Sequence, residues 1–221
     1  MTAVDHREVL RLLAKRNVDI GRERTRLVCR LHNALSELSP GGIAKEINAS
    51  DVHGFLERVD PATVVEQVRF DLAVELLDDI ERLDIQLKAS HRRIRTAVTA
   101  ANTSLTDIYG IGPIAAMLIG YSGDPTRFAS ADAYAAYNGT APVEFSSGGR
   151  QTHRLSRRGN RRLNHALHLA ALCQIRQTES AGRRYFDRKV DEGKTKKEAL
   201  RALKRRISNT VYRHLFADTL R

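Results

Sequence analysis

A long apolar repeat between residues 60 and 100 constrains the fold more than any other feature of this sequence. Asp60-Pro61, a capping carboxylate followed by a proline, indicates where a helix begins. Apolar residues then recur at steps of three and four, at Val65, Val68, Leu72, Leu76, Ile80, Leu83, Leu87 and Ile94. A helix that continues to about Ala100 would be roughly 60 Å long. We therefore expect a second long helix to cover its apolar stripe.

Two candidates exist for the covering helix. One is the helical pattern from Asp5 to Leu38, in which leucines recur at positions 27, 31, 35 and 38. The other is the same long helix of a second subunit. The sequence does not choose between them, and we predict a coiled-coil arm through which the chain forms a homo-oligomer.

The basic charge of the chain is concentrated near its C-terminus. The whole sequence carries a formal net charge of +11, whereas residues 150–221 alone carry 20 Lys and Arg against 6 Asp and Glu. A positive field of this kind favours a polyanionic partner, since phosphate contacts supply most of the affinity for nucleic acids. A merely solvated basic face is the weaker alternative, because few acids lie among the basic residues.

Composition argues against several other classes of protein. Cys29 and Cys173 are far apart and form no CxxC pair, which is typical of a reducing compartment, so we expect a cytoplasmic protein. The N-terminal residues are too charged for a signal peptide. No apolar run approaches the ~20 residues that a membrane-spanning helix needs, so we expect no membrane association.

Two glycine-rich loops could bring backbone N–H groups close to a phosphate. Gly110 and Gly112 can adopt positive φ and precede Pro113, a pattern similar to a helix-hairpin-helix turn. The second loop, Ser146-Ser147-Gly148-Gly149, leads directly into arginines. Ser147 is our candidate nucleophile, although a serine hydroxyl needs a base, a metal or a cationic cluster to react. The residues alone favour ordinary turn positions for both serines, because Ser-Gly pairs mostly mark turns.

Basic and polar residues that could contact nucleic acid follow this loop. They are Gly148 in the loop itself, then Arg150, Arg154, Arg157, Arg158, Asn160, Arg161 and Arg162. We expect Asn160 to start a helix and the arginines to neutralise phosphate groups. His165 and His168 lie three residues apart, but no carboxylate or cysteine stands beside them, so we predict no metal site. The chain also lacks the spaced acids of a two-metal nuclease.

These patterns predict an all-α fold with two parts. Residues 1–100 would form the long helical, coiled-coil arm. Residues 101–221 would form a compact helical domain that contains the helix-hairpin-helix-like turn, the serine loop and the basic helices.

The ordered series of motifs in the second part resembles the C-terminal half of the insertion-sequence-110 family of transposases, the RNA-guided bridge recombinases. The resemblance runs through Tyr109-Gly110-Ile111-Gly112-Pro113, Arg127-Phe128, Ala135-Ala136-Tyr137-Asn138-Gly139, Pro142, Ser147-Gly148, Leu155-Ser156-Arg157-Arg158-Gly159-Asn160, Leu163, Gly193-Lys194 and Ala199. It implies that Ser147, or Ser146 if the register differs, attacks a DNA phosphodiester and holds a covalent phosphoserine link. Gly148, Arg157, Gly159 and Asn160 would then shape the loop and the adjoining helix start.

The resemblance also implies partners beyond this sequence. In the family a RuvC-like half supplies acidic residues that bind Mg²⁺, and a structured guide RNA pairs with DNA. We expect no cofactor in this chain itself, Mg²⁺ only with a RuvC-like half, and a truncated chain that depends on that half. Asn164 departs from the family pattern, which has an arginine there. The alternatives are a non-catalytic module for nucleic-acid binding and dimerisation, and an inactive transposase remnant.

Overall fold

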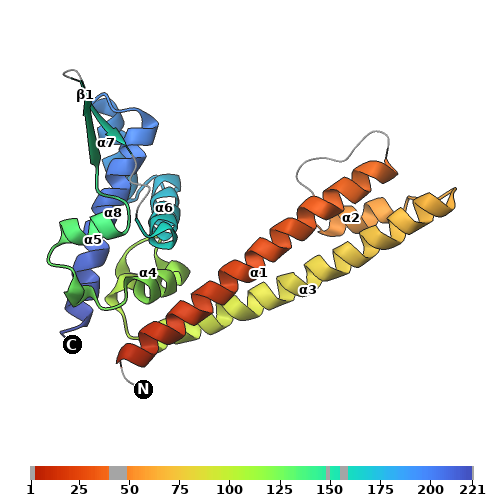
Figure 1. Cartoon of the computed structure of the whole chain (residues 1–221), viewed down its shortest axis with the longest axis horizontal. Helices are drawn as coiled ribbons and strands as arrows, with labels where there is room; N and C mark the ends of the chain where they lie inside the picture. The colour runs from red at the N-terminus through yellow and green to blue at the C-terminus, as the bar shows by residue number, and fades with distance from the viewer. Residues whose placement is uncertain (1–2, 40–48, 148–149, 155–158, 221) are drawn as a thin grey trace. The chain divides into compact units, whose positions relative to one another are not determined.

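The computed structural model describes the backbone of residues 3–39, 49–147, 150–154 and 159–220, and the side chains of residues 6–39, 51–142 and 159–220. Its elements are α1 (Ala3–Leu38), α2 (Ala49–Leu56), α3 (Val64–Ala100), η1 (Ser104–Asp107), η2 (Gly112–Ile114), α4 (Ala115–Ser122), η3 (Pro125–Arg127), α5 (Ala131–Tyr137), β1 (Val143–Ser147), β2 (Arg150–Arg154), α6 (Arg161–Arg176), α7 (Ala181–Asp191) and α8 (Lys196–Asp218) (Figure 1). The helices confirm the all-α prediction, and a single β-hairpin is added to it.

The chain divides into two compact units. One comprises residues 15–93, and the other combines residues 1–14 with residues 94–221. The long helices α1 and α3 each contribute to both units, because the boundaries fall inside them.

The unit of residues 15–93 is an antiparallel helix pair. Ion pairs join Arg24 to Asp84 and Arg69 to Glu37, so the sequence numbers rise along α1 as they fall along α3. Between the helices lies a core formed by Leu27, Leu31, Leu35, Val52, Leu56, Ala73, Leu77 and Ile80. The chain's own first helix is therefore the partner that covers α3, one of the two candidates that the sequence left open.

The buried stripe of α3 differs from the predicted one at its beginning. Val65, Val68 and Leu72 are 60%, 52% and 50% exposed, whereas Ala73 and Leu77 are buried. The spacing of three and four alone did not reveal this shift of about one residue. The covering partner sets which face of a helix is buried, and α2 and α1 here select the face of Ala73 and Leu77.

The cap of α3 also lies later than predicted. The backbone N–H of Glu66 donates to Thr63 Oγ1 at 3.2 Å, and the N–H of Thr63 donates to Glu66 Oε2 at 3.1 Å. This reciprocal pair is a capping box, which satisfies two N–H groups at the helix start. Asp60-Pro61 therefore belongs to the approach to the helix and not to its first turn.

Helix α8 is the centre of the second unit. It packs against α5, α6, α7 and η1, and Leu203, Ile207, Val211 and Leu215 are buried along it. Helix α8 begins with a capping box of Thr195 and Glu198, the residue types and spacing that favour this motif.

Helices α1 and α4 approach closely within the same unit. A Cβ atom added at Gly120 would lie 2.6 Å from the backbone N and Cα of Arg11, so no larger residue fits without movement of a backbone. Glycine at this position lets two helices touch along their main chains.

Four aromatic rings from three segments pack together beside α8. The centroid of Phe128 lies 5.2 Å from that of Tyr134 and 5.1 Å from that of Tyr137, and Tyr134 stacks on Tyr212 at 5.6 Å. Tyr134 is fully buried and its hydroxyl lies 2.9 Å from Ser122 Oγ. Burial raises the pKa of Tyr134 to about 12 from its ordinary value of 10.0. The cluster thus fixes η3 and α5 against α8.

Among the helices that the structure describes, none combines the length and the apolar composition required to cross a bilayer.

We predict opposite effects of the same substitution at two helical glycines. Gly120→Ala forces a Cβ against Arg11 and should destabilise the protein by about 1–3 kcal/mol. Gly21→Ala, in a stretch of α1 where an added Cβ meets nothing within 4 Å, should stabilise it by about 0.5–1 kcal/mol. Urea denaturation measures both changes, and equal effects would contradict the close approach of α1 and α4.

A second prediction concerns Tyr134→Phe at alkaline pH. The neutral phenol is favoured in the folded state, so its stabilising contribution is complete below the unfolded pKa and is lost as pH rises through about 10 toward about 12. The wild type should lose up to roughly 3 kcal/mol over that range through this group. At neutral pH the free energy of unfolding of the variant should be lower by about 1 kcal/mol, because one hydrogen bond is missing. Above pH 10 the variant should not show the decrease expected of the wild type. Parallel curves of unfolding free energy against pH would refute the assignment.

Candidate functional site

The predicted nucleophile lies on a β-hairpin. Strands β1 and β2 pair antiparallel, with Ser147 opposite Arg150 and Ser146 opposite Gln151 in the Cα register. The sequence had predicted a loop with some extended character here. Ser147 is the last residue of β1, so the backbone places it at the turn end of the hairpin.

Several predicted site residues lie beyond what the structure describes. Gly148, Arg157 and Arg158 fall outside the described residues, and for Ser147, Arg150 and Arg154 only the backbone is described. The backbone brings Ser147 and Arg150 opposite each other at the turn and leaves Arg154 at the far end of β2.

The chain entering the hairpin is held by a buried asparagine. Asn138 is fully buried after α5, and its Nδ2 donates to Ser208 Oγ on α8 at 2.8 Å. Its Oδ1 accepts from the backbone N–H of Thr140 at 3.1 Å and from Thr140 Oγ1 at 2.6 Å. The side chain therefore fixes the path of the backbone between α5 and β1, because each of its polar atoms is bonded within the protein.

The chain leaving the hairpin returns to the same point. A Cβ atom at Gly159 would lie 2.5 Å from the backbone N of Gly139, so the two backbones are in direct contact. The N–H of Asn160 donates to the carbonyl of Tyr137 at 2.6 Å. The two segments that bracket the hairpin are thus fastened together.

Asn160 starts α6, as predicted. Its Oδ1 accepts from the N–H groups of Arg162 and Leu163 at 3.1 and 3.2 Å, and its Nδ2 donates to Tyr137 Oη at 3.2 Å. Both polar ends of this side chain are therefore engaged within the protein, which gives Asn160 a positioning role beside the predicted nucleic-acid contact.

Asn164 connects this junction to α8. Its Nδ2 donates to the carbonyl oxygens of Asn138 at 3.0 Å and Gly139 at 3.1 Å. Its Oδ1 accepts a hydrogen bond from Lys204 Nζ at 2.6 Å. The residue that departs from the family pattern thus holds the hairpin entry, a function that sequence reasoning did not foresee.

Lys204 is the functional candidate that sequence reasoning missed. It is only 7% exposed, and burial lowers the pKa of its ammonium group. A signal was present, because Lys204 occupies the same helical face as Leu200, Ser208 and Val211, where an apolar or small residue is expected. A lysine on the buried stripe of an amphipathic helix needs a polar environment.

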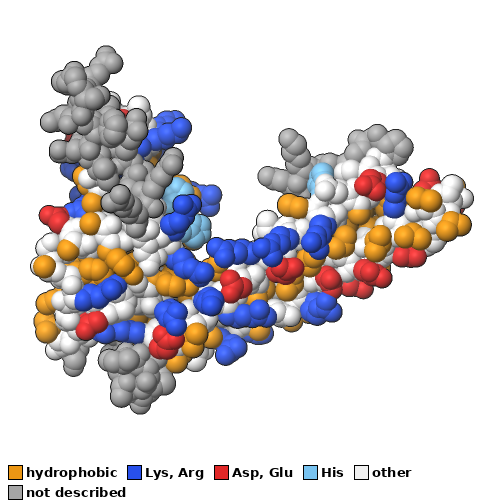
Figure 2. Space-filling view, in the orientation of Figure 1, with side chains coloured by type: hydrophobic (Ala, Val, Ile, Leu, Met, Phe, Trp, Pro, Cys, Tyr) orange, Lys and Arg blue, Asp and Glu red, His pale blue; other side chains and the backbone are white. Residues whose placement is uncertain are grey.

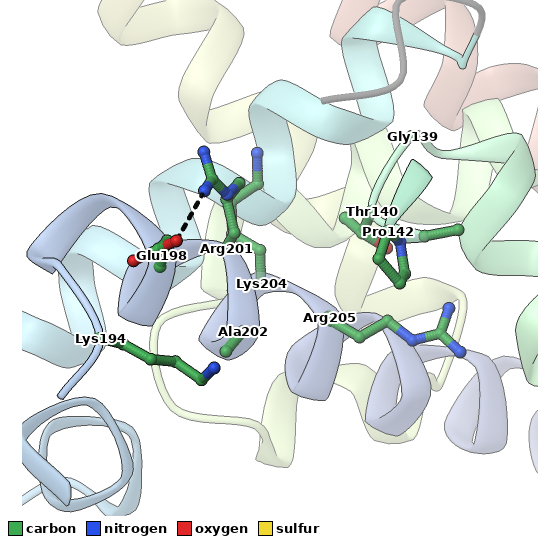
Figure 3. A pocket seen from close by; sticks show the side chains of 10 residues that line it. Gly139, Thr140, Pro142, Lys194, Glu198, Arg201, Ala202, Lys204 and Arg205 are labelled. Carbon is green, nitrogen blue, oxygen red and sulfur yellow. Dashed lines mark ion pairs between the residues drawn. The ribbon is translucent and has the colours of Figure 1, made fainter. Parts of the chain in front are cut away.

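A pocket of about 230 Å³ opens beside Lys204. Its lining combines the hairpin entry with the first half of α8, namely Gly139, Thr140, Ala141, Pro142, Lys194, Glu198, Arg201, Ala202, Lys204 and Arg205. We call it the hairpin-base pocket. Figure 3 shows the basic side chains of α8 on one side of it and Thr140 and Pro142 on the other.

The acids near this pocket are already paired. Glu198 Oε1 lies 3.9 Å from Arg201 Nη2, and Glu198 Oε2 accepts a hydrogen bond from the Thr195 hydroxyl at 2.7 Å. Asp132 on α5 pairs with Arg205. The pocket therefore has more cationic than anionic groups in its lining.

The N-terminal half of α6 adds further basic side chains to those of α8. Arg161 and His165 are exposed, whereas Arg162 donates to Tyr121 Oη at 2.6 Å and lies over that ring at 5.2 Å. Burial, and then the charges of Lys204 and His165, lower the pKa of His168. Histidine side chains lie beside those of lysines and arginines over α6 (Figure 2). Within the described part of the chain, no three His, Cys, Asp or Glu residues gather as metal ligands would.

The two glycines of the first loop have different surroundings. Gly110 has φ of +82°, and an added Cβ would lie 3.1 Å from Cys173 Cβ on α6. Gly112 is exposed, with nothing within 4 Å of an added Cβ. The turn joins the short 3-10 helix η1 to η2 and α4. Gly110 thus serves the packing of the turn on α6, and Gly112 is the position whose backbone is open to a ligand.

Comparison with known proteins finds matches over much of the chain. Residues 102–187 match the family described as Transposase IS116/IS110/IS902. The chain is 39% identical over 156 residues to the insertion element IS900 uncharacterized 42 kDa protein of Mycobacterium paratuberculosis, a match that covers 68% of this chain and 37% of that protein. It is 39% identical over 107 residues to the insertion element IS110 uncharacterized 43.6 kDa protein of Streptomyces coelicolor, covering 47% and 26% respectively. The chain spans well under half the length of these curated relatives.

The role of Asn164 leads to a stability prediction. Asn164→Ala removes the donor to two carbonyl groups and the acceptor of the Lys204 ammonium, so it should destabilise the protein by roughly 2–3 kcal/mol. Asn33→Ala, at an exposed position of α1, is the matched control and should change stability by less than about 0.5 kcal/mol. Urea denaturation gives both values. If Asn164→Ala were as harmless as the control, the junction would not depend on this side chain.

Proposed function

This chain belongs, through residues 102–187, to the IS116/IS110/IS902 family of transposases, and we propose that it binds DNA and exchanges strands by attack of Ser147 on a phosphodiester. A transposase role follows from the family in general. The nucleophile, the guide RNA and the dependence on a second half are our proposals for this chain.

The position of Ser147 on the hairpin is the observation that carries the proposal. The residue lies at the turn of a hairpin whose two ends are fastened together at Gly139 and Gly159. A reacting group has to be held in one orientation relative to its substrate, because the effective concentration of the two reacting atoms rises when their geometry is fixed. A hairpin fixed at its base would hold the end of β1, where Ser147 lies, in one orientation toward a DNA backbone.

The chemistry proceeds in two balanced steps. Ser147 Oγ loses its proton to a base and attacks the phosphorus, the bond from phosphorus to one sugar oxygen breaks, and that oxygen takes up a proton to become a free hydroxyl. The hydroxyl of another strand then loses its proton and attacks the phosphorus of the phosphoserine, the bond to Ser147 Oγ breaks, and the serine oxygen regains a proton. The number of phosphodiester bonds is conserved, so no external energy source is required.

Charge stabilisation would come from the arginines around the hairpin. The phosphorane-like transition state carries extra negative charge on its equatorial oxygens, which guanidinium groups stabilise well. Arg150 is the Cα partner of Ser147 and is the first candidate, with Arg154, Arg157 and Arg158 following along the chain. Arg161 begins α6 as an exposed contact for a flanking phosphate.

The remaining partners are inferred from the family resemblance. Mg²⁺ would be held by carboxylates of a RuvC-like half, as the resemblance implies. A structured RNA would bind the same basic surface through its phosphates. A second copy of the chain would complete a synaptic complex that holds two DNA duplexes.

The decisive prediction concerns a covalent adduct. When the chain is incubated with insertion-sequence DNA and its guide RNA, together with a RuvC-like half, a protein–DNA adduct resistant to denaturation should form. The yield of this adduct should fall at least about 100-fold in Ser147→Ala, because no other hydroxyl replaces the nucleophile. Electrophoresis after denaturation measures it, and mass spectrometry locates the modified residue.

Ser146→Ala is the matched control and should keep the adduct. If Ser146→Ala abolished it and Ser147→Ala did not, the nucleophile would be the neighbouring serine. If the wild type bound DNA with full affinity but formed no adduct under any condition, the chain would be a non-catalytic binding module.

A further inference from the structure

Lys204 is a buried cation with no anionic partner in the described part of the chain. It is 7% exposed, and its hydrogen bond goes to the neutral amide oxygen of Asn164. Burial is the cause that lowers the pKa of its ammonium group, with no carboxylate acting against it. A buried ammonium group is costly unless an opposite charge compensates it.

The ionisable groups around Lys204 increase this imbalance. Lys194, Arg201 and Arg205 line the same pocket, and His168 faces Lys204 from α6. Among the described residues of the lining the one acid is Glu198, which is engaged by Arg201 and by the cap of α8.

A second polar group near the pocket also lacks a partner. The Nη1 atom of Arg205 is buried without a hydrogen-bond partner among the described residues, although Nη2 of the same guanidinium pairs with Asp132. Buried donors without an acceptor are rare, and an acceptor from outside the protein would satisfy this one. Lys204 and Arg205 thus both point to a missing group that is rich in acceptors and negatively charged.

A phosphate group meets this requirement. It carries negative charge and several acceptor oxygens, and lysine and arginine together form the common protein environment for it. The pocket volume of about 230 Å³ exceeds what a phosphate needs and leaves room for part of an attached sugar. Pro142, in the pocket wall, directly precedes β1, so a group bound there lies at the root of the hairpin that carries Ser147.

We propose that the hairpin-base pocket binds a phosphate group through the cations of its lining, Lys204, Arg205 and Arg201, and that in the nucleoprotein complex this group is a non-reacting phosphodiester of the nucleic-acid backbone. Figure 3 shows Arg201 and Lys204 rising from the same part of α8. The site anchors the backbone away from the scissile phosphate, so the strand enters the hairpin in a fixed register. Only the source of the phosphate depends on the proposed transposase function.

The first experiment uses the whole chain without DNA. Thermal unfolding is followed with increasing inorganic phosphate at constant ionic strength, since a ligand that binds the folded state raises Tm in proportion to its occupancy. The wild type should gain several degrees more than Lys204→Met. Lys197→Met removes the same charge from an exposed position of α8 outside the pocket and should respond like the wild type. This control also corrects for the general stabilisation that phosphate gives to most proteins.

Arg201→Gln provides a second variant in case Lys204→Met folds poorly. Its side chain is 43% exposed, so the substitution leaves the core intact. It should lose most of the phosphate response while unfolding at the same temperature as the wild type in phosphate-free buffer.

The second experiment identifies the source of the phosphate. Binding of a DNA duplex is measured at several salt concentrations, and each lost phosphate contact should reduce the slope of log K against log[salt] by about 0.9. A reduced slope in Lys204→Met or Arg201→Gln shows that a backbone phosphodiester occupies the pocket. If the variants have the same salt slope as the wild type, while the wild type responds to inorganic phosphate and the variants do not, the ligand is a free phosphate or nucleotide. That result overturns the backbone assignment.

The outcomes are separate from those of the serine test. Phosphate binding at Lys204 without any adduct at Ser147 would support this site and refute the catalytic proposal. If the wild type, Lys204→Met and Arg201→Gln responded identically to phosphate and to salt, the pocket would not be a phosphate site, whatever Ser147 does.

Discussion

The contact between the backbones at Gly139 and Gly159 is the constraint on which the predicted site depends. It joins the two ends of the hairpin, and it requires glycine at 159, because a Cβ atom there would lie 2.5 Å from the backbone N of Gly139. Asn138 stabilises the same junction through hydrogen bonds to Ser208 and Thr140. A turn that carries a reacting hydroxyl keeps its orientation only if its base cannot spread, and this junction meets that requirement.

From that junction a line of polar contacts runs to the basic helix α8. Asn164 donates hydrogen bonds to the carbonyl groups at the hairpin entry and accepts one from Lys204, so a cation at the pocket and the path of the hairpin are linked through one amide side chain. An anion in the pocket would therefore act on the position of the hairpin as well as on charge. The proposed binding of a backbone phosphate would therefore be coupled to the position of the strand that ends at Ser147.

Local patterns predicted the ends of helices well in this unit and less well in the other. Asn160 and Thr195 cap α6 and α8 as expected, because a cap depends on residues within one turn of the chain. The beginning of α3 was misassigned, since Thr63 competes with Asp60 for the same role and both fit the pattern. The exposed side chains of Val65 and Leu72 show that periodicity alone does not identify the buried face.

The sequence by itself determined the all-α class, the two long helices, the basic C-terminal region and the resemblance to the transposase family whose model residues 102–187 match. It also named Ser147 as the candidate nucleophile, which remains a prediction. Only the tertiary structure decided that α1 covers α3 within one chain, that Asn164 supports the hairpin, and that Lys204 is buried beside a pocket. The physical reason is that caps and periodicity arise from neighbours within a few residues. The burial of a charge and the meeting of two glycines depend on segments that are far apart in the chain.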